Sequence, residues 1–128
     1  MRVVVMDDYN DTRELIVTLL RLVRIDVHAT ANGLEGIELV RRWLPDVALV
    51  DHRMPGAHAD EVAATLRAAP ATHGIPLILV KTITDAAGCE HLFDAVIQQP
   101  FDFGTLYGAL LPYTPSDMQD SLRRWHMP

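Results

Sequence analysis

Short apolar runs alternate along the chain with longer segments whose apolar residues recur at helical spacing. Each run is almost uninterrupted by polar residues, as expected for a β-strand that is buried on both faces. Five such strands are predicted, over residues 3–6, 27–29, 47–50, 77–80 and 95–98. Because strands of this kind occur almost only in parallel sheets that helices cover, the pattern predicts an α/β fold.

The segments between the runs carry apolar residues three and four positions apart, which is the spacing of one helix face. Asp11 or Thr12 is a candidate cap for the first helix, and Asn32 with Glu35 has the spacing of a capping box at the start of the second. The apolar positions assigned to helix faces are Leu15, Leu19, Leu22 and Val23, then Leu34, Ile37, Val40 and Leu44, then Val62, Ala63 and Leu66, and finally Phe103, Leu106, Tyr107 and Leu110.

Strands that alternate with helices favour right-handed crossovers and a doubly wound sheet. The favoured strand order is 2-1-3-4-5 with helices on both faces, the flavodoxin-like arrangement. In this order strands 1 and 3 are neighbours, and their carboxyl ends flank the switch point where ligands bind in open α/β sheets. Asp7 and Asp8 end the first strand, and we expect them to converge with Asp51, which ends the third.

Composition narrows the class of protein. A chain of 128 residues, nearly half of them apolar, is long enough for one domain with a substantial core. The formal charge of −6 and the scattered basic residues argue against direct binding of nucleic acid, which needs a clustered basic face. No apolar run approaches the length of a membrane span. The single cysteine, Cys89, suits a reducing compartment, so we expect a cytoplasmic protein.

Three carboxylates at one point of a sheet predict a specific chemistry. Like charges that lie close together repel one another unless a cation joins them, and Mg²⁺ prefers oxygen ligands of this kind. A carboxylate can also attack phosphorus and form an aspartyl phosphate. We therefore interpret the site as one for Mg²⁺-assisted phosphoryl transfer, in which Asp51 is the nucleophile and Asp7 and Asp8 hold the metal directly or through water.

Several motifs together resemble the receiver domain of bacterial two-component response regulators, the CheY-like family. They are Met6-Asp7-Asp8, Asn32-Gly33-Leu34-Glu35, Pro45-Asp46-Val47, Asp51-His52-Arg53-Met54-Pro55-Gly56, Ile75-Pro76 and Pro100-Phe101. The resemblance implies that Asp51 accepts a phosphoryl group from the phosphohistidine of a sensor histidine kinase or a phosphotransfer protein. It also implies that Mg²⁺ is bound by Asp8, Asp51 and the backbone carbonyl of Arg53, with Asp7 close by. Such a chain is a signalling domain for an unknown output partner, and not an enzyme beyond its own phosphorylation and dephosphorylation.

Two positions depart from the family pattern. Members typically end strand 5 with a lysine that contacts the phosphoryl oxygens, where this chain has Gln99, and Val96 replaces the usual aromatic residue three positions earlier. The Thr or Ser that usually ends strand 4 aligns with Lys81, and Thr82 follows it. Lys81 and Thr82 are both candidate site residues. Because side chains alternate along a regular strand, only one of the two can face the site. We expect Lys81 to supply the missing charge. The segment between strands 4 and 5 is shorter than usual, which predicts a short or irregular helix there.

Two other functions stay open. One is a pseudo-receiver that binds a partner without phosphorylation, which Gln99 and Val96 favour. The other is a metal-dependent phosphatase with an aspartyl-phosphate intermediate. Such enzymes usually carry a second carboxylate two residues after the nucleophile, where this chain has Arg53. A transition-metal site is not expected, because the six histidines show no zinc-ligand spacing.

The end of the chain is expected to lie outside the receiver domain, which we assign to residues 1–113. Residues 114–128 form a tail, in which an apolar stripe predicts a short amphipathic helix over 117–125. We expect this helix to dock on its own domain or on a second copy of the chain, in a homodimer; the alternative is a frayed terminus. The stripe consists of Met118, Leu122 and Trp125.

Overall fold

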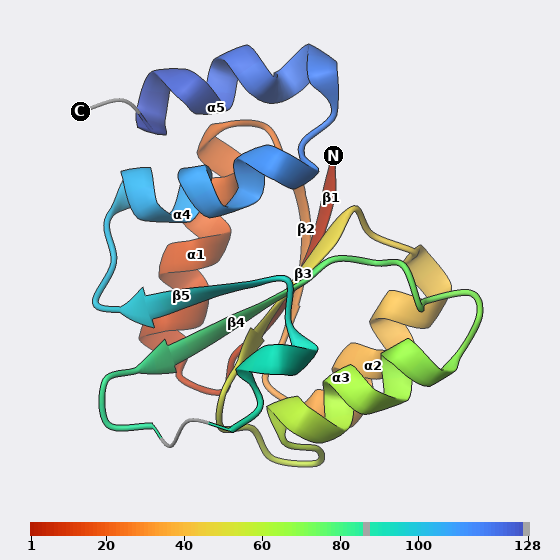
Figure 1. The fold of residues 1–128 in the computed structure, drawn as a ribbon. Coiled ribbons are helices and arrows are strands. Elements are labelled where there is room, and N and C mark those ends of the chain that lie inside the picture. The colour runs from red at the N-terminus through yellow and green to blue at the C-terminus, as the bar shows by residue number, and fades with distance from the viewer. Residues whose placement is uncertain (86–87, 127–128) are drawn as a thin grey trace.

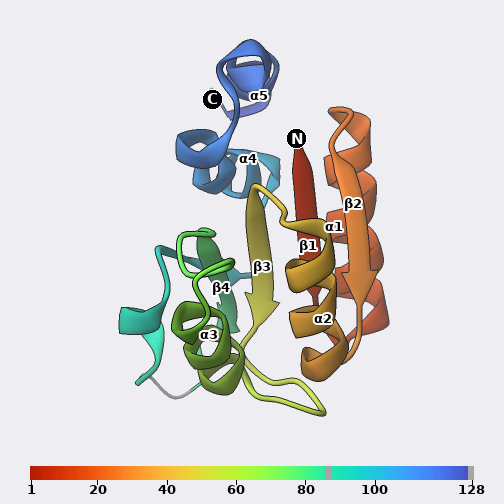
Figure 2. The same cartoon turned by 90° about the vertical axis from the view of Figure 1, so that its right-hand side faces the viewer.

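The computed structural model describes residues 1–85 and 88–126 and contains a five-stranded parallel sheet (Figure 1). Its order is β2-β1-β3-β4-β5, which confirms the predicted topology. The carboxyl ends of the strands meet at one edge of the sheet, because all neighbouring pairs are parallel (Figure 2). The strands are β1 (Arg2–Met6), β2 (Asp26–Thr30), β3 (Val47–Asp51), β4 (Leu77–Thr82) and β5 (Ala95–Gln99).

Helices cover both faces of the sheet and divide the core into two layers. On one face, α1 (Asn10–Leu22) and α4 (Phe103–Leu110) pack on the sheet, and on the other face α2 (Gly33–Trp43) and α3 (Ala59–Ala68) do so. Side chains alternate across each strand, so Leu49 of β3 belongs to the layer of α1 and α4, whereas Val50 belongs to the layer of α2 and α3. A sheet that is buried on both faces explains the continuous apolar runs.

The two predicted helix caps have different outcomes. Asn32 caps α2, because its side-chain Oδ1 accepts hydrogen bonds from the backbone N–H groups of Leu34 at 2.8 Å and Glu35 at 3.2 Å. The prediction that Asp11 or Thr12 caps α1 is wrong, since α1 already begins at Asn10. The helix begins early because the Asp7 carboxylate accepts the N–H of residue 9 at 3.0 Å and fixes the chain just before the first turn.

Five of the apolar residues assigned to helix faces are exposed, so those assignments are wrong. A helix that lies on a sheet buries only the side chains along its line of contact, and residues at the margin of the stripe or at the helix ends stay in solvent. The exposed residues are Leu15, Leu22, Leu34, Leu44 and Phe103. The centres of the stripes are buried as predicted.

The connection between β4 and β5 contains only a single 3₁₀ turn, η1 (Glu90–Leu92), within its described residues. Residues 86–87 in the same connection lie outside the described part of the chain. The expected short or irregular helix between these strands is therefore confirmed.

The C-terminal segment packs on the rest of the chain. It continues from α4 through η2 (Leu111–Tyr113) and η3 (Ser116–Met118) to α5 (Gln119–His126). Leu122 of α5 is fully buried in the same core layer as α1 and α4. Figure 2 places α5 at the end of the sheet where the strands begin, away from the strand tips. The side chain of Trp125 lies outside the described part of the structure, and the assignment of 114–128 as a separate tail stays a prediction.

Candidate functional site

Asp7, Asp8 and Asp51 meet at the carboxyl ends of β1 and β3. One carboxylate oxygen from each lies within 4.8 Å of the other two, an arrangement that no other three His, Cys, Asp or Glu side chains of the described residues share. Asp7 is buried, Asp51 is half-buried and Asp8 is exposed. The prediction that these three carboxylates converge is confirmed, and it follows from the parallel pairing of β1 with β3.

The electrostatics of these carboxylates favour a cation. Burial, and next the negative charge of Asp7, raise the pKa of Asp51 to about 8. Burial also raises the pKa of Asp7, although the hydrogen bond from the Tyr9 N–H opposes this effect. Both shifts express the cost of holding several negative charges together away from water. A divalent cation removes that cost, and three carboxylates form the hard oxygen donor set that fits Mg²⁺.

The loop after Asp51 is held against the start of α2. The Gly33 N–H donates to the Pro55 carbonyl at 3.0 Å, and a Cβ at Gly33 would collide with the backbone carbonyl of Ala57. Gly56 has a φ of 85°, in the left-handed region that glycine adopts without strain. The motif that begins with Asn32-Gly33 therefore acts on the site indirectly, by fixing the path of the loop that carries Arg53.

Asp85 is a residue of the site that the sequence analysis missed. Its Oδ2 accepts the Thr82 N–H at 2.8 Å, and its Oδ1 lies 3.1 Å from the Arg53 Nε and 3.7 Å from the His52 Nδ1. Burial raises its pKa, but the hydrogen bonds with Thr82 outweigh burial and leave the pKa lowered. Asp85 thus joins the loop after β3 to the end of β4. The only signal in the sequence is the Thr82-x-x-Asp85 spacing, which is common in turns.

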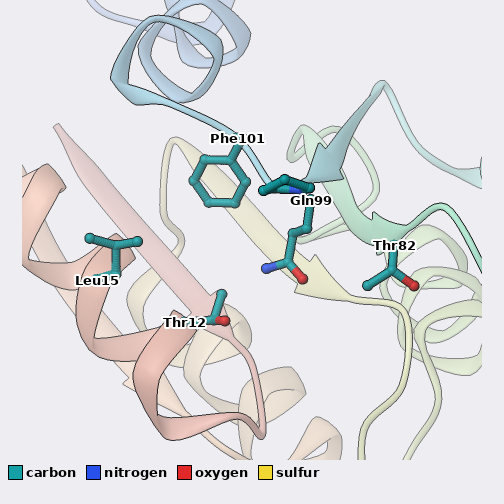
Figure 3. A pocket seen from close by; sticks show the side chains of 6 residues that line it. Thr12, Leu15, Thr82, Gln99 and Phe101 are labelled. Carbon is teal, nitrogen blue, oxygen red and sulfur yellow. The ribbon is translucent and has the colours of Figure 1, made fainter.

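Lys81 and Thr82 lie on opposite faces of β4. The Lys81 Nζ donates to the Glu90 Oε1 at 2.7 Å, and the lysine side chain is only 15% exposed. Thr82 pairs in register with Gln99, and both line a cavity of about 320 Å³ between α1 and β5. Figure 3 shows the Gln99 amide extending into this cavity between Thr12 and Thr82. The ammonium group is therefore paired with η1, and an uncharged amide lies on the α1 side of the site.

The comparison with known families decides the class of this site. Residues 3–109 match the model of the response regulator receiver domain. The chain belongs to the response regulator receiver-domain family. It is therefore a signalling domain of two-component systems and not a classical enzyme, with an acidic pocket consistent with an Mg²⁺-dependent phosphoacceptor site.

Individual relatives of this receiver domain are longer proteins. The DNA-binding response regulator MtrA of Mycobacterium tuberculosis is 30% identical over 104 residues, which cover 78% of this chain and 44% of MtrA. The probable transcriptional regulatory protein NarL of the same organism is 45% identical over 69 residues, which cover 52% of this chain and 32% of NarL. The receiver domain thus spans less than half the length of these curated relatives.

Solved structures share the fold of this receiver domain. A response regulator from Chloroflexus aurantiacus J-10-fl has a TM-score of 0.79 and 22% identity, and the match covers 88% of this chain and 96% of that one. Another is the receiver domain of a sensor histidine kinase from Pseudomonas aeruginosa PAO1, which was solved with a magnesium ion coordinated in its active site cleft. It has a TM-score of 0.75 and 19% identity, and the match covers 98% of this chain and 96% of that one. None of the helices in the described part of this receiver domain is long and apolar enough to cross a bilayer.

Proposed function

We propose that this receiver domain accepts a phosphoryl group on Asp51 from the phosphohistidine of a sensor histidine kinase or a phosphotransfer protein, in the cytoplasm. The observation that carries the proposal is the convergence of Asp7, Asp8 and Asp51 at one strand edge. Asp51 is the acceptor because it is half-buried at the tip of the central strand, whereas Asp8 is exposed and Asp7 is tied to the N–H of Tyr9.

The transfer exchanges one bond to phosphorus for another. A carboxylate oxygen of Asp51 forms a bond to phosphorus while the N–P bond of the phosphohistidine breaks, and the imidazole nitrogen keeps the electron pair. Asp8, Asp51 and the backbone carbonyl of Arg53 would hold Mg²⁺, with Asp7 beside them. Bound Mg²⁺ neutralises negative charge on the carboxylates and on the phosphoryl oxygens. The contacts of Asp85 with Thr82 and with the side chain of Arg53 support this arrangement, because they fix the loop after β3.

Lys81 supplies the positive charge that Gln99 lacks. It is the only lysine of the chain, and it follows Val80, the register partner of Asp51 on the adjacent strand. Its present partner is Glu90, and a phosphoryl group on Asp51 adds nearly two negative charges close by. The ammonium group then moves from Glu90 towards the phosphoryl oxygens. Thr82 contributes at most a hydrogen bond from its hydroxyl.

Intact mass spectrometry after incubation with acetyl phosphate and Mg²⁺ tests the acceptor. We expect the parent chain to gain the mass of one phosphoryl group and Asp51→Asn to gain none. Asp26→Asn is the matched control, because it removes an exposed carboxylate at the opposite end of the sheet. A chelator should abolish the gain. Equal phosphorylation of Asp51→Asn and the parent would overturn the site, and equal rates with and without chelator would overturn the role of the metal.

A pseudo-receiver that works without phosphorylation is the second candidate. The pairing of Lys81 with Glu90 and the uncharged Gln99 favour it, because together they leave the phosphoryl site short of positive charge. If neither acetyl phosphate nor a phosphorylated histidine kinase modifies the folded parent chain, the pseudo-receiver replaces the phosphoacceptor. The phosphatase alternative has no support here, since the side chain at the position of its second carboxylate is the guanidinium of Arg53.

A further inference from the structure

A second cavity, of about 460 Å³, lies on the α3 side of the sheet, between the loop after β3 and the segment that contains η1. Five of its lining residues carry side-chain atoms that can bind a metal. They come from three separate parts of the chain, and the function proposed above uses none of their side chains. These residues are His52, His58, Asp60, Cys89 and His91.

The donor atoms of this cavity differ in kind from those of the acidic site. Imidazole nitrogen and thiolate sulfur are the ligands of Zn²⁺ and of neighbouring transition metals, whereas Mg²⁺ takes oxygen. The one cysteine of the chain and three of its six histidines line this single cavity. A zinc site needs four ligands at most, and five candidates are present.

His52 has the surroundings of a metal-binding imidazole. Only 19% of its side chain is exposed, and its buried Nδ1, 3.7 Å from the Asp85 Oδ1, has no hydrogen-bond partner among the described residues. Histidines that bind metals commonly turn one ring nitrogen towards a carboxylate and the other towards the ion. Asp85 faces Nδ1 of His52 in this way, so Nε2 is the nitrogen that would bind an ion in the cavity that His52 lines.

We propose that this cavity binds one divalent ion of the zinc class through His52, Cys89 and His91, with His58 or Asp60 as the fourth ligand. Among the described residues only the acidic site already has three ligand atoms within 4.8 Å of one another, so these side chains must rotate inward around the ion. His58 and His91 are exposed, which leaves their rotamers able to change. The bound ion would join the loop after the phosphoacceptor to the connection between β4 and β5.

Metal titration of the unphosphorylated full chain tests the site independently of the proposed phosphorylation. Zn²⁺ or Co²⁺ is added in the presence of saturating Mg²⁺, so that the acidic carboxylates are already occupied. We expect binding of one ion per chain, a rise in thermal stability with Zn²⁺, and a thiolate-to-metal charge-transfer band with Co²⁺. Cys89→Ser should abolish that band, and His91→Asn should weaken Zn²⁺ binding at least tenfold.

Two controls separate this site from others. His73→Asn removes an exposed histidine that is not part of the cavity lining, and it should bind Zn²⁺ like the parent. Far-ultraviolet circular dichroism without metal shows whether each variant is folded; because His91 is exposed, His91→Asn keeps the test valid if Cys89→Ser does not fold. The proposal is overturned if Zn²⁺ does not bind, if Cys89→Ser and His91→Asn both bind it as the parent does, or if Asp51→Asn alone abolishes binding.

Discussion

Gln99 and Lys81 change where positive charge lies near Asp51, although the carboxylates of the site follow the family pattern. Position 99 is uncharged, and the positive charge lies on Lys81 at the end of β4. The Gln99 amide has N–H groups that can donate hydrogen bonds but carries no charge, and it lies in the cavity on the α1 side. The Lys81 ammonium group lies on the other face of the sheet and is held by Glu90 at 2.7 Å. If Lys81 serves the phosphoryl group as we propose, phosphorylation has to draw it away from this ion pair, and Glu90 then competes with the phosphoryl group.

We expect Lys81→Ala to slow phosphorylation by acetyl phosphate about 10²- to 10³-fold, which is the usual cost of removing one electrostatic donor from a transition state. Thr82→Ala should slow it less, because a hydroxyl carries no charge. Glu90→Gln should speed it, since Lys81 then has no competing partner. Glu38→Gln is the control, because it removes an exposed carboxylate that is paired with Arg41 on the surface of α2. The measurement is the initial rate of mass gain.

Two other results of these variants would contradict the proposed role of Lys81. An unchanged rate in Lys81→Ala together with a much faster Gln99→Lys would mean that the phosphoryl site simply lacks a charge. If none of the variants takes up a phosphoryl group at Asp51, the domain is a pseudo-receiver.

At the scale of elements, the start of α2 holds the loop after β3, which carries Arg53. Asn32 caps the helix, and the next residue donates its N–H to the loop. A helix start and a loop from different parts of the chain are thus held at backbone contact distance. Glycine is required at position 33 because of this close approach and not because of its backbone dihedral angles.

Gly33→Ala should therefore lower the free energy of unfolding by about 1–3 kcal/mol, the usual cost of overpacking, because the new Cβ collides with the Ala57 carbonyl. It should also slow phosphorylation, since the displaced loop carries Arg53. Gly74→Ala is the matched control, because no atom of the described residues lies within 4 Å of the added Cβ. Urea unfolding gives the free energies. Equal stability of the two variants would mean that the loop moves aside at no cost.

At the scale of the whole molecule, α5 and the acidic site lie at opposite ends of the sheet. The N-terminal amino group lies 3.6 Å from the Met118 Sδ, and Leu122 is buried with residues of α1 and α4. The C-terminal segment thus covers apolar surface at the amino ends of the strands (Figure 2). We expect this segment to contribute to stability, because its described residues lie away from the acidic residues.

Truncation after Pro115 should lower the melting temperature, and Leu122→Ala should cost about 2–5 kcal/mol, the usual cost of removing a buried leucine side chain. Arg123→Ala is the control, since Arg123 is an exposed neighbour on the same helix. Thermal unfolding and light scattering measure stability and oligomeric state. If the truncated chain keeps both the stability and the oligomeric state of the parent, α5 adds nothing. A change in oligomeric state alone would mean that α5 joins two copies of the chain.

The sequence by itself determined the class of fold, the strand order and the acidic site. Short continuous apolar runs that alternate with helices are typical of strands buried on both faces of a sheet, and right-handed crossovers leave few ways to order five such strands. The convergence of Asp7, Asp8 and Asp51 follows from that order, because parallel neighbours end at the same edge. The cap at Asn32 was predictable for a local reason, since its partners lie two and three residues away.

Only the tertiary structure decided which side chains meet when they lie far apart in the sequence, because no sequence spacing predicts such contacts. Asp85 reaches Arg53 and His52, Lys81 pairs with Glu90, and the cysteine shares a cavity with three histidines, because irregular connections bring these groups together. Helical spacing also placed Leu15, Leu22, Leu34 and Leu44 on core faces, where the narrow contact between helix and sheet leaves them exposed. Periodicity reports the direction of a side chain along its own element, whereas burial and pairing depend on what the neighbouring elements place opposite it.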